Sequence, residues 1–515
     1  MRGWRGALLL GGLLLLAIRL AGDAVGPVLT PSQLRILEGV ARNRSSGNWT
    51  ELSSNQLVEL RGKAEKTDDA IRSYHLPGGL VASLRYAQRF EGTNRTEVAG
   101  YENLDLSGAY TGLYLSACCY RYAVYREPAV LAGIRAALDG VELLLRSSGR
   151  PGYLPRFAGL RSDEAYKKYY SAWGGEDPDR PGFGRLAYPG GPDAKAYVWL
   201  GGPSREVYSG INLGLASIFQ YVREPKIRER MTNIVDQLIG RLEADHWRLD
   251  DGQGNLVFVP PVQAAAILRT ATSVNKKYGT LYQPRLDDLM NDHGGEPLVQ
   301  PGLCLYCDYG DSVFQLADLM VLCRLEPETM PGKNFFQERM TQIYRRSNFH
   351  LNPWLAAAYL STLERAPGDV ACRAALQGML YQFPIPRWAK AAVRGTNSVT
   401  ETIEANGSQW SRVPFQLEER QVQAFQWAKS PVYLPMGEDA LVVHPGIDFI
   451  LPFWIARDGN VIPDADSITT PMTMKGSSTN SIRTRVPGTN TLRDRLGSPT
   501  AGPTRSTATN SPQIK

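Results

Sequence analysis

Cysteine is scarce in this chain, with six in 515 residues. That number is too low for a fold held together by disulfides. Cys118 and Cys119 are adjacent in an apolar stretch, where burial in a core is the favoured interpretation. Cys304 and Cys307 have the spacing of zinc ligands, but no second Cys pair or His pair follows. A local disulfide or two buried thiols is therefore favoured there, and the sequence predicts neither a metal nor a cofactor.

Several catalytic signatures are also missing. The chain has no His-Glu-x-x-His, no Gly-rich phosphate loop with a Lys, no Gly-x-Ser-x-Gly and no Gly-x-Gly-x-x-Gly after a strand. These absences disfavour zinc proteases, nucleotide hydrolases, serine hydrolases of the elbow type and dinucleotide-dependent enzymes.

A long apolar run occurs only at the N-terminus. Arg2 and Arg5 precede an apolar stretch from 6 to 18, and small residues follow around Ala21 and Ala24, which is the order found in a secretory signal peptide. The stretch is short for a membrane span, which takes about 20 residues, although an uncleaved anchor is the alternative. We predict a signal peptide over 1–24, a secreted or periplasmic protein, and no stable membrane insertion after cleavage.

The basic charge lies at the ends of the chain. Residues 467–515 are rich in Ser, Thr, Asn and Pro, and their seven Lys or Arg and one Asp give +6, which equals the net charge of the whole chain. Because residues 1–24 add +2, residues 25–466 carry −2, which argues against nucleic acid binding. Residues 467–515 contain too few apolar residues to bury the surface that would offset the entropy lost on ordering. The sequence therefore predicts a disordered tail over 467–515.

The body of the chain repeats a helix–turn–helix pattern. Turns that end in Pro recur at 126–128, 223–225, 324–327 and 364–367, each after an apolar stretch. Pro fits the first turn of a helix, where its missing N–H costs nothing. Four such turns predict four helical hairpins.

The two helices of a hairpin differ in pattern. Residues 227–242 carry a single apolar stripe, as expected of an outer helix, whereas 204–222 is apolar or small nearly all round, as expected of an enclosed one. Long inserts at 148–203 and 383–446 fit a closed ring better than an open solenoid. We therefore predict an all-α, two-layer toroid over 70–466, preceded by a helical segment over 25–69. Other enclosed helices are expected at 108–124, 259–274, 312–322, 352–363 and 448–456.

Polar residues precede the enclosed helices. In a ring of hairpins these helices run the same way, so their N-termini gather on one face. Helix capping is the alternative explanation for each carboxylate, but Arg, His and Asn in the same set favour a site for a hydroxyl-rich ligand. The residues are Glu102, Asp105, Arg205, Glu206, Asp308, Asp311, His350, Asn352, His444 and Asp448.

Aromatic residues are frequent in the inserts, and Trp173 and Trp427 are two of them. Exposed rings stack on the C–H faces of sugars while polar groups bind the hydroxyls. The alternative is that these rings pack the inserts onto the helices.

Four regions carry a resemblance to a known group. These are LPGGLVASLRY (76–86), ENLDLSGAYTGLYLSACCYRYAV (102–124), SREVYSGINLGLA (204–216), and QWAKSPVYL (426–434) with HPGIDFILPFWIAR (444–457). They resemble six-hairpin glycosidase-like proteins, a largely uncharacterised secreted group, over residues 70–460. The resemblance implies an (α/α)6 toroid and carbohydrate metabolism, but it implies no catalytic pair.

The leading functional prediction is a glycoside hydrolase acting on an oligo- or polysaccharide. Such an enzyme needs two carboxyl groups, one as acid and one as base, and Glu206 with Asp105 or Glu102 is the predicted pair. Arg205, His350 and Asn352 would orient the sugar, with Asp308, His444 and Asp448 as further contacts. A polysaccharide lyase using Tyr208 or His350 as base is the second prediction, and a glycan-binding protein without turnover is the third.

Overall fold

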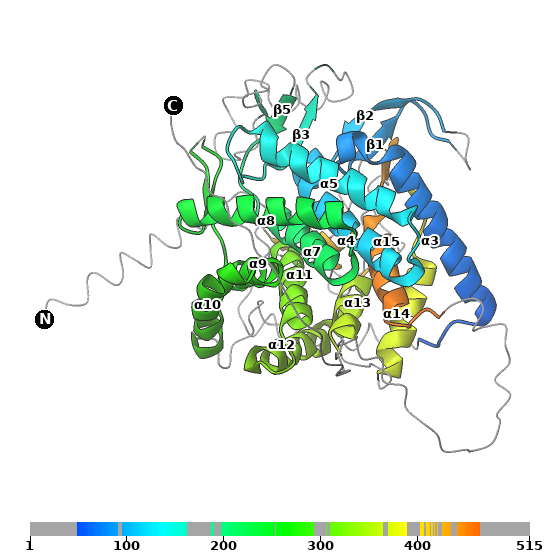
Figure 1. Ribbon diagram of the computed structural model, residues 1–515. Coiled ribbons are helices and arrows are strands. Elements are labelled where there is room, and N and C mark those ends of the chain that lie inside the picture. Colours follow the sequence, from blue (N-terminus) through cyan, green and yellow to red (C-terminus); the bar gives the residue numbers. More distant parts are fainter. Residues whose placement is uncertain are drawn as a thin grey trace, which may run out of the picture. The chain divides into compact units, whose positions relative to one another are not determined.

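Twelve α-helices in the described part of the chain form two layers (Figure 1). The structure is a computed structural model that describes residues 49–90, 95–160, 162, 187–189, 197–252, 254–292, 305, 309–363, 369–388, 402–405, 408–411, 414–415, 417, 420, 425–433 and 440–463. The inner helices are α4 (Ser107–Tyr125), α7 (Arg205–Tyr221), α9 (Pro261–Val274), α11 (Tyr309–Leu325), α13 (Pro353–Thr362) and α15 (Ile447–Asp458). The outer helices are α3 (Ser54–Tyr74), α5 (Val130–Ser147), α8 (Pro225–Ala244), α10 (Gly279–Asp292), α12 (Pro331–Ser347) and α14 (Val370–Gln382).

The inner helices close a circle. Helix α4 packs on α7, α7 on α9 and α11, α11 on α9 and α13, α13 on α15, and α15 again on α4. The predicted toroid is therefore confirmed, and the region 259–274, which the sequence left without a clear partner, supplies the inner helix α9.

Each outer helix packs on its own inner helix, and these pairs make six hairpins. Five of them join neighbours in the chain: α4 with α5, α7 with α8, α9 with α10, α11 with α12, and α13 with α14. The sixth pairs α15 with α3, so it joins the two ends of the ring. Helix α3 spans residue 69, so the toroid begins inside the segment predicted as a separate 25–69 region.

Of the three described turns, the one at 223–225 places its Pro at the first position of a helix as predicted, whereas α5 begins two residues after Pro128 and α12 four residues after Pro327. Helix α8 has Glu224 as its N-cap, with the side chain accepting a hydrogen bond from the Ile227 amide, and Pro225 at its first position. Its buried face includes Met231 and Leu238, in agreement with the single apolar stripe. The predicted turns at 126–128, 223–225 and 324–327 connect or border helix pairs as expected. The fourth turn, 364–367, lies outside the described residues.

Glycine sets the closest helix contact in the ring. A Cβ placed on Gly112 of α4 would lie 2.2 Å from the carbonyl carbon of Gly210 of α7. A Cβ on Gly210 would lie 2.4 Å from the Ala109 carbonyl oxygen. The two backbones therefore touch, and no larger residue fits at either position without displacing a helix.

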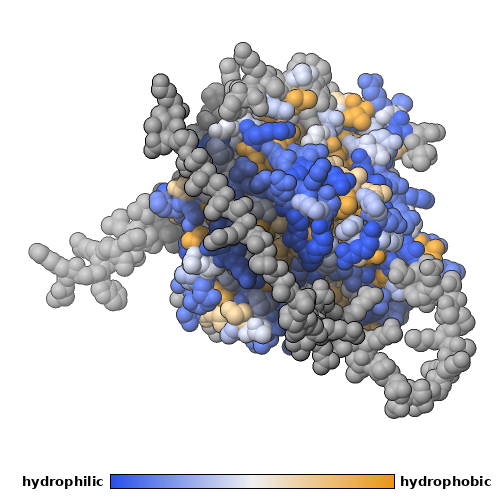
Figure 2. Space-filling model, in the orientation of Figure 1, coloured by the Kyte–Doolittle hydropathy of each residue, from blue (hydrophilic) through white to orange (hydrophobic). Residues whose placement is uncertain are grey.

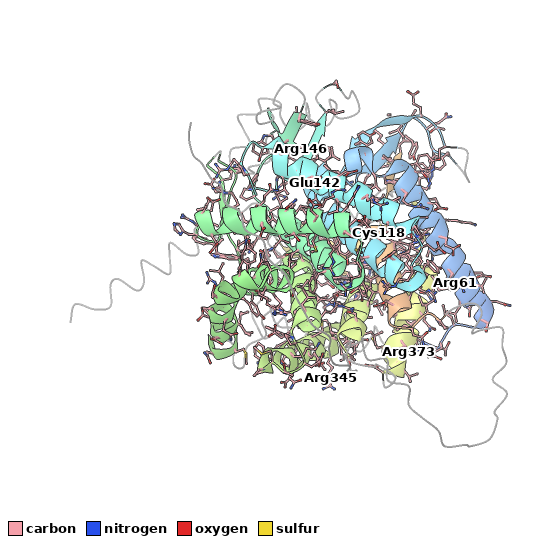
Figure 3. All side chains as sticks on the ribbon, in the orientation of Figure 1. Arg61, Cys118, Glu142, Arg146, Arg345 and Arg373 are labelled. Carbon is pink, nitrogen blue, oxygen red and sulfur yellow. The ribbon has the colours of Figure 1, made fainter. Side chains whose placement is uncertain are left out.

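The outer surface is polar and the space between the layers is apolar. Figure 2 shows mostly hydrophilic residues across the visible face, with hydrophobic residues in small separate groups. Figure 3 places Arg345 on α12 and Arg373 on α14, at the edge of the ring, whereas Cys118 of α4 lies inside. Cys118, Cys119, Cys323 and Cys372 are buried free thiols. The predicted core position of Cys118 and Cys119 is therefore confirmed.

Short antiparallel strands complete the described chain. One sheet has the order β2 (Val98–Glu102), β1 (Ser83–Tyr86), β11 (Val442–His444), β8 (Arg387–Trp388). A second has the order β3 (Phe157–Leu160), β5 (Tyr197–Leu200), β4 (Ala187–Pro189). Two hairpins pair β6 (Arg248–Asp250) with β7 (Leu256–Phe258), and β9 (Thr402–Ala405) with β10 (Ser408–Ser411). Their importance for the site is that β5 leads directly into the N-cap of α7.

Arg324 connects the C-terminal ends of the inner helices. Its Nη1 donates to the Ser361 carbonyl of α13 at 2.9 Å, and its Nε donates to Gln220 Oε1 of α7 at 3.0 Å. Its guanidinium also lies 3.8 Å from the Asp458 carboxylate of α15, which accepts a 2.6 Å hydrogen bond from Tyr221. One partly buried cation therefore connects four inner helices where their dipoles are negative.

Several predictions fall on residues that the structure does not describe. They include the segment 1–24, the tail from 467, Asp308, Trp173, and the pair Cys304 and Cys307. Among the described helices, none combines the length and the apolar character that crossing a membrane requires.

Candidate functional site

The N-termini of the inner helices gather at one end of the ring, as the sequence predicts. Gln263 Nε2 of α9 donates to the Arg205 carbonyl oxygen of α7 at 2.6 Å. Arg205 Nη2 in turn donates to Asp311 Oδ2 of α11 at 2.7 Å. Asn352, the N-cap of α13, donates to the Tyr309 hydroxyl of α11 at 3.2 Å. Four inner helices therefore begin within one hydrogen-bonded region.

A cavity of about 200 Å³ lies among the first turns of three of these helices. Charged and amide side chains make up most of its wall. Helix α7 contributes Arg205, Glu206 and Ser209, the start of α9 contributes Pro260 and Gln263, and α11 contributes Asp311, Phe314, Gln315 and Asp318.

Glu206 is held ionised at the edge of this cavity. The Ser204 hydroxyl donates to Glu206 Oε2 at 2.6 Å, and Ser204 also caps α7 by accepting from the Val207 amide. Burial acts to raise the pKa of Glu206, but the charge of Arg156 and the hydrogen bond from Ser204 outweigh it, so the pKa lies below its ordinary value. Glu206 is therefore a carboxylate at neutral pH.

Asp318 has the opposite electrostatic character. Its side chain is fully buried on α11, one oxygen accepts a 2.7 Å hydrogen bond from Ser209, and burial raises its pKa to about 8. A carboxyl group with this pKa keeps its proton at pH 7. One cavity therefore contains an ionised carboxylate and a neutral carboxylic acid, an arrangement that separates a base from an acid.

Gln263 completes the polar wall. Its amide nitrogen donates to Ser209 Oγ at 2.7 Å as well as to the Arg205 carbonyl. Within the described part of the chain, neither Gln263 Oε1 nor Asp318 Oδ1 has a hydrogen-bond partner, although both atoms are buried. Buried polar atoms are nearly always paired, so these two atoms mark the cavity as a place where a ligand would bind.

No model of a known protein family matches this chain, and a search of curated proteins finds no relative. Among solved structures it is similar to the cellobiose 2-epimerase from Spirochaeta thermophila, with 13% identity and a TM-score of 0.23. The match covers 63% of this chain and 97% of that one. The ring described above is established by the contacts between its own helices.

The cavity contains some of the residues predicted from the sequence. Arg205 and Glu206 line it, together with Asp311. Asp105 and Glu102, predicted as partners of Glu206, are not in its wall. Glu102 forms a 2.9 Å ion pair with Arg85 on the neighbouring strand, and the Asp105 carbonyl accepts from Arg156 Nη1 at 3.1 Å. The carboxyl groups that share a cavity with Glu206 are instead Asp311, which is paired with Arg205, and Asp318.

His350 and Asn352 form a neighbouring group. Both are buried, and Tyr309 joins them through hydrogen bonds of 3.3 Å to His350 Nδ1 and 3.2 Å to Asn352. Arg420 fixes this group by donating to the His350 carbonyl at 2.6 Å. The structure therefore brings the two residues together as predicted, but they are not part of the cavity wall.

The remaining predicted contacts are buried inside the protein. Tyr208 accepts a hydrogen bond from the Leu154 amide at 3.1 Å, and burial raises its pKa, which is unfavourable for a base. His444 lies 2.8 Å from the Ser83 hydroxyl, and Asp448 is fully buried. Trp427 is 1% exposed and donates its indole N–H to the Asp448 carbonyl. The prediction that Trp427 offers a stacking face is corrected, because its ring packs in the core.

Sequence reasoning missed Asp318, Gln263 and Ser209. Asp318 stands alone in the apolar stretch 312–322, which was interpreted only as an inner helix. A single carboxyl group inside such a helix is itself a signal, because Asp is almost never fully buried without a function or a partner. Among the described residues, no group of His, Cys, Asp and Glu is arranged to hold a metal ion.

Proposed function

We propose that this protein is a glycoside hydrolase and that Glu206 and Asp318 are its reacting groups. Asp318 donates its proton to the glycosidic oxygen, and the Glu206 carboxylate activates the attacking water. The observation that carries the proposal is the pair of opposite pKa shifts in one cavity, lowered for Glu206 and raised to about 8 for Asp318. Glycoside hydrolysis requires such a pair of unlike carboxyl groups.

The rest of the wall supports a sugar ligand. Arg205, Ser209 and Gln263 offer hydrogen-bonding groups. Gln263 Oε1 can accept a hydrogen bond from a sugar hydroxyl, because no described residue donates one to it. The room enclosed by these side chains is that of about one water molecule. It therefore suits the attacking water, and the sugar would bind where the cavity opens to solvent.

The test is a product screen of the purified protein against neutral and uronate-containing oligo- and polysaccharides. New reducing ends are expected, and both Glu206→Gln and Asp318→Asn should lower their rate of release by about 100-fold or more, the size typical of general acid–base groups. Asp105→Asn and Glu102→Gln are matched carboxyl controls, and we expect them to keep most of the activity.

Three outcomes would overturn the proposal. Loss of activity in the Asp105 or Glu102 variant with full activity in the Asp318 variant would restore the pair predicted from the sequence. Unsaturated products that absorb in the near ultraviolet would indicate a lyase. Saturable glycan binding without any product would indicate a binding protein.

A further inference from the structure

Arg156 lies where three parts of the site meet. Its amide donates to the Leu200 carbonyl at the end of β5 at 3.1 Å, and its carbonyl accepts from the Gly108 amide at the start of α4 at 2.9 Å. The residue therefore joins the loop before β3 to the strand that leads into α7 and to the first turn of α4.

The guanidinium of Arg156 extends this connection. Its Nε donates to the Gly202 carbonyl at 2.9 Å and its Nη2 to the Pro203 carbonyl at 3.4 Å, so it holds the turn just before the N-cap Ser204. Its Nη1 reaches the Asp105 carbonyl before α4 at 3.1 Å. The side chain is 9% exposed, so its charge acts in a poorly solvated region, where electrostatic interactions are strong.

We propose that Arg156 is the positioning residue of the site: its guanidinium, which donates to three backbone carbonyls, fixes the turn that precedes Glu206 and brings a poorly solvated positive charge to the start of α7. A role of Arg156 in catalysis rests on the proposed function. Its effect on the charge of Glu206 does not depend on that function. The other charged or titratable groups around Glu206 are Arg205 on its own helix and Asp311 and Asp318 on α11, whereas α9 contributes Gln263, which does not ionise. Among the interactions that lower the pKa of Glu206, the charge of Arg156 has the largest effect.

Two substitutions separate the charge from the hydrogen bonds. Arg156→Gln keeps an N–H donor for the carbonyls but removes the charge, whereas Arg156→Lys keeps the charge but loses the planar fork. In the pH–rate profile, the acid limb of Arg156→Gln should move up by about one pH unit or more, a loss of about tenfold at the foot of the limb. The limb of Arg156→Lys should stay in place, as should that of the control Arg150→Gln in the same loop.

A second measurement needs no substrate. Glu206→Gln is introduced into the unchanged protein and into Arg156→Gln, and unfolding by denaturant is followed from pH 3.5 to 6. With Arg156 present, the folded pKa of Glu206 is lowered, so the stability lost through Glu206→Gln should grow as the pH rises. Without that charge, only hydrogen bonds oppose the effect of burial on the pKa of Glu206, so the same loss should grow less over this range or shrink.

The two readouts have distinct meanings. A weaker or reversed pH trend in the Arg156→Gln background supports the proposal even if no glycan is turned over, in which case only the proposed function fails. Equal trends, or an acid limb that moves as far in Arg156→Lys as in Arg156→Gln, would overturn it. If Arg156→Gln does not fold, an acid limb shifted by a pH unit in Arg156→Lys overturns the charge role, and an unmoved limb supports it.

Discussion

Asp318→Asn removes a carboxyl group whose protonation couples folding to pH. Burial raises the pKa of Asp318 to about 8 in the folded protein, whereas the ordinary value is 3.8. The folded chain keeps the proton over this interval while the unfolded chain releases it. The stability that Asp318 contributes is therefore complete below pH 3.8 and is lost as the pH rises to 8.

The magnitude follows from the width of the interval. Each pH unit inside it lowers the free energy of unfolding by about 1.4 kcal/mol. Between pH 6.5 and 8 the loss is roughly 1 to 2 kcal/mol, because titration of the folded state flattens the curve near its pKa. Two other buried groups titrate at lower pH: burial raises the pKa of Asp68 to about 6 and lowers that of His75 to about 3. The difference between the unchanged protein and Asp318→Asn in the window from 6.5 to 8 therefore isolates Asp318, because the titration of His75 in the unfolded chain near pH 6.5 is common to both proteins.

The assay is reversible denaturant unfolding at several pH values in this window and at constant ionic strength. The unchanged protein should lose stability with rising pH, and Asp318→Asn should remove that loss because an amide does not ionise. Asp139→Asn is the matched control, since it removes a carboxylate whose side chain is 66% exposed. Equal slopes for the unchanged protein and Asp318→Asn would refute the reasoning, and with it the neutral acid on which the proposed mechanism depends.

Other consequences can be checked in the same way. Arg324→Met should lower the free energy of unfolding by about 1 to 3 kcal/mol, because it leaves the Ser361 carbonyl and Gln220 Oε1 without their charged donor, and an unchanged denaturant midpoint would contradict that role. Gly112→Ala should cost about 1 to 3 kcal/mol through overpacking, whereas Gly240→Ala on α8, with nothing within 4 Å of the added methyl, should gain up to about 1 kcal/mol; equal melting shifts would refute the close contact. Because burial raises the pKa of Cys118 and of Cys372 to about 12, both thiols should resist alkylation in the folded protein at pH 8 and react in denaturant. Labelling of either in the native state, read by peptide mass spectrometry, would show that they are open to solvent.

The ring itself could be predicted because its pattern is local. A stripe such as Ile227, Met231 and Leu238 predicts an outer helix, and a Pro at the first helical position predicts where it starts. These features depend only on neighbours in the chain. The closing pair of α3 with α15 could not be predicted in this way. The two helices are neighbours in the ring but far apart in the sequence, so no local pattern relates them.

The site was predicted in part for the same reason. Arg205 and Glu206 stand at a helix start, where a polar residue is easily noticed. Asp318 sits two turns inside an apolar helix, and its partner Ser209 is on another helix, so their 2.7 Å contact depends on the register between α7 and α11. Sequence patterning predicts which face of a helix is buried, but it does not predict which residues of two helices lie opposite each other.

The pairing of the first and last helices has a consequence for how the ring is made. The Trp454 indole of α15 donates to Asp68 of α3 across 386 positions of sequence, whereas the other five hairpins join adjacent segments. During synthesis those five can pair as they leave the ribosome. The apolar edges of α4 and α13 must wait for Phe449, Phe453 and Trp454 to cover them. A ribosome that stalls before residue 447 would thus hold an open ring with exposed edges, the kind of species that chaperones bind and that aggregates.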